Sequence, residues 1–285
     1  MEDLIGINTV ERLVKEQFPQ YCHLPIKSVE IQGHDNRTFR LGNDMLVRLP
    51  SAEIYTAKVV IEQKWLPFLA KNLSVKIPQP IALGKPSDAY SMPWSIYSWI
   101  DGTSANQLLL DDETLKTIAF ELSEFLKQLH RISTDSAPQA GNHNFFRGAH
   151  PSIYDAEARE ALAKLNLPDV IWGKALQSKW NKNLVWIHGD LAVGNILLKN
   201  DHLVGVIDFG GMAVGDPACD LTIAWTLFKN ESRKIFYQNL ALDEDTWNRA
   251  RGWALWKAAI ELVKDENKNG ARAIEWKRVI GEIFL

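Results

Sequence analysis

Two acidic segments of the sequence carry the residue types that phosphoryl transfer needs. In WIHGDLAVGNILL, Asp190 comes soon after an apolar run and Asn195 stands five residues later; in GVIDFGG, Asp208 ends a second apolar run. Amide and carboxylate oxygens suit Mg²⁺, which takes few protein ligands and completes its shell with phosphate and water. A further carboxylate could orient a hydroxyl and accept its proton. Positioning, metal charge and a base are the parts of phosphoryl transfer.

We expect Asn195 and Asp208 to meet, because the strand candidates between them, residues 196–199 and 203–207, could pair as a hairpin. The alternative is that the aspartates cap turns, as loop aspartates often do. That alternative must explain two aspartates, an asparagine and the flanking glycines together, so we favour the catalytic interpretation.

The first third of the chain is rich in strand signals. Residues 4–18 have the pattern of an amphipathic helix, and Ser28–Pro50 alternates apolar and polar residues as in a β-meander. Ala52–Lys71 has a helical pattern with Pro67 near its end. Residues 77–102, rich in proline and strand formers, predict two more strands.

The remainder is mainly helical. Asp111–Arg131 is the clearest helical pattern, and helices are also expected after Asp216. Three short strand candidates interrupt this part: residues 184–187, 196–199 and 203–207.

These patterns predict an α+β protein with a boundary near Trp99–Asp101. We expect a small, β-rich N-lobe over residues 1–98 and a larger, mainly helical C-lobe over residues 99–285.

Composition limits the class of protein. The 285 residues are 46% hydrophobic and 24% charged, which is ordinary for a soluble globular protein, and the net charge of −3 gives no reason to expect a nucleic-acid partner. No transmembrane-length run or signal-peptide pattern is seen, so no membrane partner is expected. The two cysteines, Cys22 and Cys219, favour a reducing cytoplasm over a disulfide framework. The sequence does not predict an oligomeric state.

H-G-D-x-x-x-x-N followed by I-D-F-G resembles the catalytic and metal segments of the aminoglycoside phosphotransferase family, in the protein-kinase-like superfamily. GDPACDL, Gly215–Leu221, resembles the segment that follows in that family. The resemblance covers nearly the whole chain and is most specific over His188–Leu221. It implies a protein-kinase-like fold, ATP or GTP and Mg²⁺ as cofactors, and transfer of the γ-phosphate to a small-molecule hydroxyl.

The resemblance assigns roles by position. Asp190 resembles the catalytic base, and Asn195 and Asp208 resemble the metal ligands. Asp220 resembles an aspartate that braces the catalytic loop, and His188 is expected to orient the same loop.

In the N-lobe the resemblance implies a nucleotide site. The turn containing Gly33, Asp35 and Asn36 could cover the phosphates with backbone N–H groups, although a hairpin turn has the same composition. The hinge that meets the nucleobase, mainly through backbone groups, is expected at Tyr97, Ser98 and Trp99.

One position departs from the family pattern. The phosphate-binding residue is usually lysine, but the strand here reads MLVRLP, with Arg48. Arginine can still bridge phosphate oxygens and Glu62, which resembles the glutamate that pairs with this cation; a solvated helical glutamate is the alternative. Because Asp190, Asn195 and Asp208 are all present, we favour an enzyme over a nucleotide-binding pseudokinase with a regulatory role.

The phosphate acceptor is less defined. Members of the family phosphorylate aminoglycosides, macrolides, choline, homoserine and sugars, so an antibiotic-type acceptor and a metabolic alcohol both stay open. We expect the acceptor site between residues 141–180 and the C-terminal helices. Arg147 and His150 could meet an anionic group, or simply stabilise their own loop.

Aromatic and acidic residues near the C-terminus allow two interpretations each. Trp247, Trp253 and Trp256 could stack on a ring of the acceptor, but core packing of an amphipathic helix is the stronger interpretation. The acidic residues of the same region could attract an amino sugar, but interspersed lysines make a solvated charged face the better interpretation. These residues are Glu261, Asp265 and Glu266, with Lys257, Lys264 and Lys268.

Overall fold

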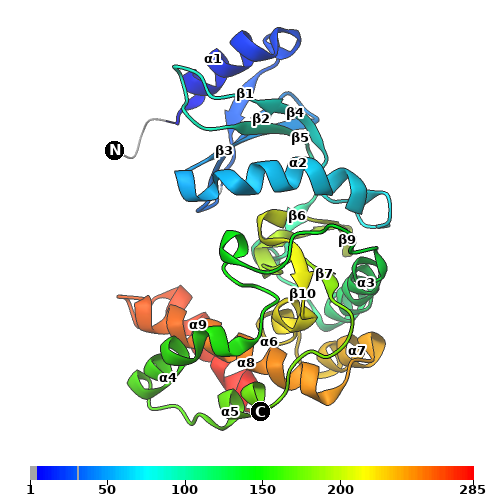
Figure 1. Cartoon of the computed structure of the whole chain (residues 1–285), viewed down its shortest axis with the longest axis vertical. Coiled ribbons are helices and arrows are strands. Elements are labelled where there is room, and N and C mark those ends of the chain that lie inside the picture. Colours follow the sequence, from blue (N-terminus) through cyan, green and yellow to red (C-terminus); the bar gives the residue numbers. More distant parts are fainter. Residues whose placement is uncertain (1–4, 31) are drawn as a thin grey trace. The chain divides into compact units, whose positions relative to one another are not determined.

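The chain divides into two units that do not follow a single cut in the sequence. The computed structural model describes residues 5–30 and 32–285 (Figure 1). Residues 1–102 with 204–210 form the N-terminal unit, and residues 103–203 with 211–285 form the C-terminal unit. The α+β prediction is confirmed, since the first unit is built on a sheet and the second is mostly helical.

An antiparallel five-stranded sheet forms the N-terminal unit, in the order β1-β2-β3-β5-β4. The predicted meander and the two later strands are therefore confirmed, apart from Ile31, which lies outside the described residues. The strands are β1 Ile26–Ser28, β2 Asn36–Leu41, β3 Met45–Pro50, β4 Pro80–Gly84 and β5 Trp94–Ser98. Gly42, with φ +62°, occupies the turn between β2 and β3, a backbone conformation that glycine adopts without strain.

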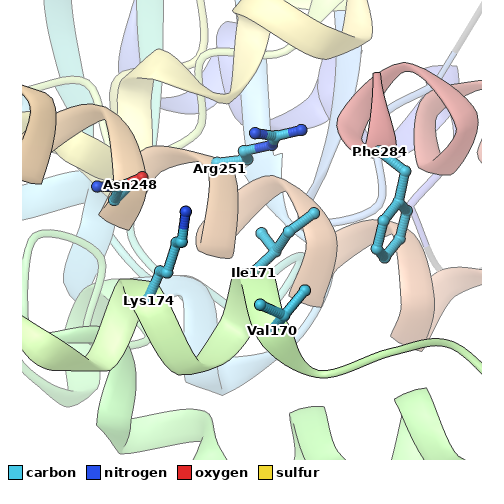
Figure 2. A pocket seen from close by; sticks show the side chains of 6 residues that line it. All are labelled: Val170, Ile171, Lys174, Asn248, Arg251 and Phe284. Atoms are coloured by element: carbon cyan, nitrogen blue, oxygen red, sulfur yellow. The ribbon is translucent and has the colours of Figure 1, made fainter.

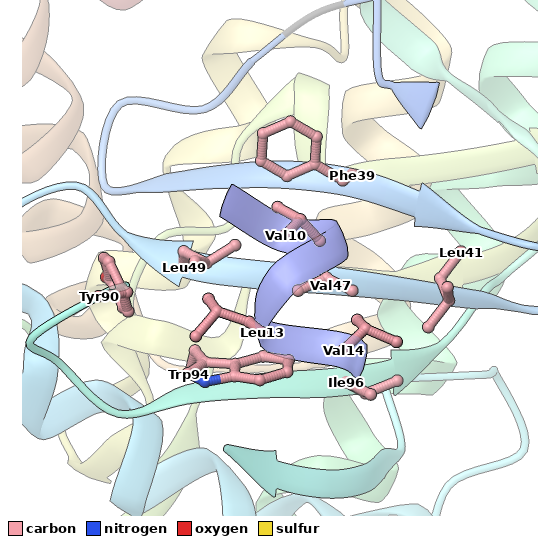
Figure 3. Close-up of a cluster of buried hydrophobic side chains, with 10 residues drawn as sticks. All are labelled: Val10, Leu13, Val14, Phe39, Leu41, Val47, Leu49, Tyr90, Trp94 and Ile96. Carbon is pink, nitrogen blue, oxygen red and sulfur yellow. The ribbon is translucent and has the colours of Figure 1, made fainter. Parts of the chain in front are cut away.

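Helix α1, Ile7–Gln17, covers one face of this sheet (Figure 3). It was predicted over residues 4–18, and residue 4 lies outside the described residues. Val10, Leu13 and Val14 of the helix are buried against alternate residues of the strands, because every second side chain points to the same face. The strand and loop side chains in this core are Phe39, Leu41, Val47, Leu49, Tyr90, Trp94 and Ile96.

Helix α2, Thr56–Ala70, contacts the opposite face. The residues between those of the α1 core turn toward it: Ser95 receives a hydrogen bond from Gln63, and Tyr97 donates one to Glu62. A short 3₁₀ turn, Glu53–Tyr55, precedes the helix. Pro67 lies inside the helix near its end, as predicted, and the helix continues past it to Ala70.

Seven helices are described in the C-terminal unit. Figure 1 shows α3 beside α7, and α8 also packs against α4, α5 and α9. Helix α3 begins after Asp111, whose side chain accepts the N–H of Thr114, as an N-cap residue does. The helices are α3 Asp112–Arg131, α4 Asp155–Lys164, α5 Val170–Gln177, α6 Ile223–Thr226, α7 Asn230–Leu240, α8 Glu244–Lys264 and α9 Ala271–Phe284. None of the helices within residues 5–30 and 32–285 is long and apolar enough to cross a membrane.

Short strands carry the candidate catalytic segments. β7, Val185–Ile187, pairs antiparallel with β10, Ala213–Gly215, and β8, Ile196–Lys199, pairs with β6, Thr103–Ser104. The turn from β8 into β9, His202–Val206, contains Asn200 and Asp201, both with positive φ. Two such residues are typical of the tight turn in a β-hairpin, as predicted for this segment.

Candidate active site

The loop after β7 is held by a buried carboxylate. Asp220 accepts hydrogen bonds from the backbone N–H of His188, at 2.7 Å to Oδ2, and of Gly189, at 2.8 Å to Oδ1. Asp220 is fully buried, and burial raises its pKa, while His188 and the two backbone donors act in the opposite direction. The expected bracing contact is therefore present.

A buried ion pair anchors the segment that carries Asp220. Nε of Arg249 on α8 lies 2.6 Å from Oδ2 of Asp216, and both side chains are almost completely buried. The N–H of Asp216 also donates to the carbonyl of Gly148, at 2.8 Å. These contacts fix the start of the 3₁₀ helix Pro217–Thr222, in which Asp220 lies.

Gly189 allows two backbone segments to approach closely. Its φ is +83°, and a Cβ built at this position would lie 2.0 Å from the carbonyl oxygen of Gly211. A side chain would therefore clash with the backbone and also strain it. The glycine of the His-Gly-Asp motif is thus explained by the tight passage of the chain past Gly211.

Asp190 presents its carboxylate to solvent while its backbone is fixed. The residue is exposed, and its N–H donates to Nδ1 of the buried His188, at 3.2 Å. Asn195 Nδ2 donates to the carbonyl of Asp190, at 2.9 Å, and thereby closes the loop. Because the amide nitrogen is used in this way, Oδ1 is the Asn195 atom suited to bind a cation.

A second cluster lies in the N-terminal unit around Arg48. Nη1 lies 3.3 Å from Glu62 Oε1, Nη2 lies 2.8 Å from Asp208 Oδ1, and the hydroxyl of Tyr97 donates to the other oxygen of Glu62. Burial disfavours the Arg48 charge, but Glu62 and Asp208 outweigh it, so the pKa of Arg48 is raised and the group stays cationic. Arg48 thus brings together Glu62 and Asp208, which are 14 and 160 residues away from it in the sequence.

Asp208 has a backbone conformation that is rare for residues with a side chain. Its φ is +66°, and its side chain is 43% exposed. Positive φ costs of order 1 kcal/mol or more for such a residue, and these conformations concentrate at functional sites. The carboxylate is accessible and lies beside a guanidinium, which is compatible with the predicted role in binding a metal next to phosphate.

Lys58 is a cation of this cluster that the sequence did not single out. Its Nζ lies 2.6 Å from Asp35 Oδ2, and the side chain is only 12% exposed. A Cβ built on Gly210 would lie 3.0 Å from Cδ of Lys58, which shows how close the helix comes to the residues after Asp208. Lys58 stands four residues before Glu62 on α2, and that helical spacing was the available signal.

The predicted phosphate-covering turn is organised by its own contacts. The Gly33 carbonyl accepts a hydrogen bond from Arg37 Nη1 at 3.1 Å, and the Asp35 carbonyl accepts one from the N–H of Ser51 at 2.8 Å. Asn36 is the first residue of β2. None of these contacts tests phosphate binding, which stays a prediction for Gly33, Asp35 and Asn36.

The predicted hinge residues have partners within their unit. Tyr97 is 1% exposed, and its hydroxyl is used by Glu62. The N–H of Ser98 donates to the Gln79 carbonyl at 2.9 Å, and the N–H of Trp99 to the Asp44 carbonyl at 2.7 Å. Their contact with a nucleobase stays a prediction. Because these two N–H groups are already used, other backbone groups of the hinge would have to bond the base.

A cavity of about 240 Å³ lies in the C-terminal unit beside Asp190. The loop residues 189–194 line it together with Arg147, Trp253, Trp256 and Trp276. His150 does not line this cavity: its ring bonds Ser152 and the Ser178 carbonyl, so stabilisation of its own loop is the correct interpretation.

The three tryptophans considered for stacking are all buried in the unit. Trp247 packs face to face with Tyr237, with ring centres 3.6 Å apart, so core packing is confirmed for it. Trp253 and Trp256 are also buried, as core packing predicts, and they contribute to the cavity wall, so stacking on an acceptor ring stays a prediction for them. Glu261 pairs with Lys257 and Arg272, but its own side chain is only 14% exposed, so the expected solvated face describes its two partners better than Glu261 itself.

A second cavity, of about 230 Å³, lies between α5, α8 and α9 (Figure 2). Val170, Ile171 and Lys174 line it from α5, with Asn248, Arg251 and Phe284 from the other helices. The Arg251 guanidinium donates to the Ile283 carbonyl at 2.6 Å from Nε, so this cation caps the end of α9. The cavity contains none of the predicted site residues.

The donor set fits a magnesium ion better than a softer metal. No group of three or more His, Cys, Asp or Glu side chains suited to a metal occurs in the part of the chain that the structure describes. A pair of one amide and one carboxylate, as in Asn195 and Asp208, is instead the sparse oxygen set that suits Mg²⁺ bound with phosphate. Because the two residues belong to different units, their meeting stays a prediction.

The fold resembles that of antibiotic phosphotransferases of known structure. The structure is similar to a GDP complex of wild-type aminoglycoside 2'-phosphotransferase-IIIa, with a TM-score of 0.73 at 18% identity; the match covers 98% of each chain. Over 98% of both chains it is also similar to macrolide 2'-phosphotransferase type I, with a TM-score of 0.62 at 15% identity.

The model of the phosphotransferase enzyme family matches residues 28–253, and the chain belongs to this family. Aminoglycoside 3'-phosphotransferase of Escherichia coli is 24% identical over 177 residues, which cover 58% of this chain and 63% of that protein. Homoserine kinase of Methylocella silvestris is 27% identical over 220 residues, covering 68% of this chain and 62% of that protein. The chain therefore matches less than two thirds of the length of these relatives.

Proposed function

We propose that the protein transfers the γ-phosphate of ATP or GTP to a hydroxyl of a small molecule, with Mg²⁺. The observation that carries this proposal is the braced loop, in which Asp220 fixes the backbone of His188 and Gly189 and leaves the Asp190 carboxylate exposed at a cavity. Membership of the phosphotransferase enzyme family supports it.

In the proposed reaction, Asp190 orients the acceptor hydroxyl and accepts its proton. The acceptor oxygen forms a bond to the γ-phosphorus, the bond from that phosphorus to the β,γ-bridging oxygen breaks, and the nucleoside diphosphate leaves. Asn195 and Asp208 would hold Mg²⁺, which supplies positive charge to the phosphates. Most of the rate gain comes from alignment and charge stabilisation.

Arg48 is proposed to bind the non-transferred phosphates. Its planar fork can address two oxygens at once, and Glu62 keeps it in place. Breaking the Arg48–Asp208 contact would release both groups for the nucleotide and its metal. Arginine at this position is therefore compatible with activity, although lysine is the usual residue.

Nucleotide and acceptor screening tests the proposal directly. The protein is incubated with ATP or GTP, with and without Mg²⁺, and with kanamycin, a macrolide, choline, homoserine and other alcohols. Mass spectrometry then looks for an acceptor that has gained one phosphoryl group. We expect a Mg²⁺-dependent product with at least one acceptor; nucleotide binding with no transfer to any of them would favour a regulatory pseudokinase instead.

A further inference from the structure

The cavity beside Asp190 contains a cation with no carboxylate of its own. Arg147 follows Phe145 and Phe146, two residues with positive φ, and the carbonyl of Arg147 accepts a hydrogen bond from the buried Asn144. This loop directs the Arg147 side chain into the cavity wall that Trp253 and Trp256 form from α8.

Aromatic faces hold the Arg147 guanidinium in place. Its Cζ lies 4.7 Å from the ring centre of Trp256 and 5.4 Å from that of Trp253. Trp256 is itself fixed, because its Nε1 donates to Glu157 at 2.8 Å and its ring stacks on Tyr154 at 4.3 Å. Cation–π contacts stabilise the charge but do not use the N–H donors of the guanidinium plane.

One of those donors is left unused. Nη1 of Arg147 is buried and has no hydrogen-bond partner within residues 5–30 and 32–285. A buried donor without a partner costs about 1–3 kcal/mol, more for a charged group. Nη1 itself is closed off, but Arg147 as a residue is only partly buried and lines the cavity, so a ligand that draws the guanidinium toward it gains a charge-assisted hydrogen bond. Carboxylates are the natural acceptors, since they bind arginine with charge-assisted hydrogen bonds.

The other charges that line the cavity are already neutralised. Lys257 lies 3.5 Å from Glu261, and Glu275 lies 2.6 Å from Arg278. Arg147 and Asp190 are the two charged lining residues that have no ion-pair partner in the described parts of the chain. A polycationic acceptor would thus face Arg147 with no spare carboxylate except the proposed base.

We propose that the acceptor is a hydroxy acid with a flat or apolar body. Its carboxylate binds Arg147, its body contacts the indoles of Trp253 and Trp256, and its hydroxyl lies at Asp190. This assignment rests on the proposed phosphotransferase function and specifies its substrate class: an anionic alcohol in preference to a polyamine such as an aminoglycoside.

A matched pair of acceptors tests the role of the carboxylate. Para-hydroxymethylbenzoate and para-hydroxymethylbenzamide differ in the charge at one end of the same ring, and kanamycin represents the polycations. We expect kcat/KM for the benzoate to exceed that for the amide by at least about tenfold, the usual order for a hydrogen bond to a charged group. In Arg147→Met this preference should disappear, and in Arg147→Lys part of it should persist.

Arg159→Met is the matched control, because Arg159 is half-exposed on α4 and pairs with Asp155 and Asp169. Its preference for the benzoate should equal that of the wild type, and circular dichroism should show both arginine-to-methionine variants folded. Equal use of benzoate and amide by the wild type, or better use of kanamycin, would overturn the substrate class while leaving the phosphotransferase function intact.

Binding without turnover separates the two proposals. Titration of intrinsic tryptophan fluorescence with each compound, in the absence of nucleotide, reports on the indoles of the cavity. Tighter binding of the benzoate that is lost in Arg147→Met would support the acid site. If no acceptor were phosphorylated, that result would count against the phosphotransferase function and not against the acid site. Equal binding of both compounds would contradict the acid site.

Discussion

Arg48 donates a 2.8 Å hydrogen bond to Asp208, so the predicted phosphate-binding cation and a predicted metal ligand are direct partners. The same guanidinium contacts Glu62, whose side chain is only 6% exposed. Arg48 therefore has two roles that a substitution should reveal: it neutralises a buried carboxylate, and it stands ready to bind phosphate when the contact to Asp208 opens.

We predict that Arg48→Met lowers both stability and nucleotide affinity. Loss of the cation leaves Glu62 buried without its charge partner, which typically costs about 3–5 kcal/mol. Arg48→Lys should keep most of the affinity, because it retains the charge but not the fork. Thermal unfolding and nucleotide titration measure the two effects. Arg12→Met, at an exposed pair on α1, is the control and should change neither; nucleotide binding by Arg48→Met at wild-type strength would contradict the assignment.

Asp220 should matter for turnover although it does not touch the reacting atoms. Asp220→Asn replaces one of its two acceptor oxygens by a donor, which leaves one backbone N–H of the loop without a proper partner and costs about 1–3 kcal/mol. We expect kcat to fall with little change in the KM of the nucleotide, and Asp220→Ala to be worse. Steady-state kinetics with Asp169→Asn as an exposed control checks this; unchanged kcat in both Asp220 variants would show that the bracing is dispensable.

The candidate catalytic loop could be predicted from sequence because its chemistry and its geometry are local. Gly189, Asp190 and Asn195 lie in one short loop, residues 189–195. A hydrogen bond from the Asn195 side chain to the Asp190 carbonyl joins two of them directly. The apolar runs on either side form β7 and β8, whose bounds match the predicted ones within a residue. Short-range spacing was sufficient here.

The remaining site residues depend on packing between distant segments. Lys58 and Asp35 are 23 residues apart, and only the contact of α2 with the turn before β2 pairs them. Arg147 reaches the cavity because two consecutive phenylalanines adopt positive φ, which their side chains disfavour. The spacing from Glu62 points to Lys58, and Arg147 stands out as a possible anion contact. The pairing of Lys58 with Asp35 and the approach of Arg147 to the cavity do not follow from the order of residues, because tertiary contacts set both.

A pair of glycine substitutions tests the tight passage of the catalytic loop. Gly189→Ala should destabilise the fold strongly or abolish it, because the new Cβ would lie 2.0 Å from the Gly211 carbonyl oxygen at a φ of +83°. Gly173→Ala, inside α5 with no atom within 4 Å of its Cβ position, should stabilise by about 0.5–1 kcal/mol through helix propensity. Urea unfolding compares them, and equal stability of the two variants would refute the argument from close approach.

Acid sensitivity should come in part from His130. Burial lowers the pKa of this residue to about 4, so the folded state resists a proton that the unfolded state takes up near pH 6.5. Its contribution is constant above about pH 6.5, and stability then falls as the pH drops toward about 4, by at most roughly 3 kcal/mol. Urea unfolding of the wild type and His130→Gln between neutral and acid pH measures this loss, which should be smaller in the variant.

His202 provides the opposite control. The hydrogen bond that this exposed histidine donates to Glu121 raises its pKa, so protonation of His202 favours the folded state, and this contribution is lost as the pH rises through that pKa. His202→Gln should therefore make the loss of stability on acidification steeper, not shallower. The same acid profile in wild type and His130→Gln would show that other groups dominate.

A single-turnover measurement on Asp190→Asn, with an acceptor that the wild type phosphorylates, tests the role of Asp190 most directly. The exposed side chain can be changed without loss of packing, so the variant should fold and bind Mg²⁺ and nucleotide within about twofold of the wild type. Loss of the base should lower the rate of phosphoryl transfer by about 10²–10⁴-fold. Transfer at the wild-type rate would contradict the central claim that Asp190 accepts the proton of the acceptor hydroxyl.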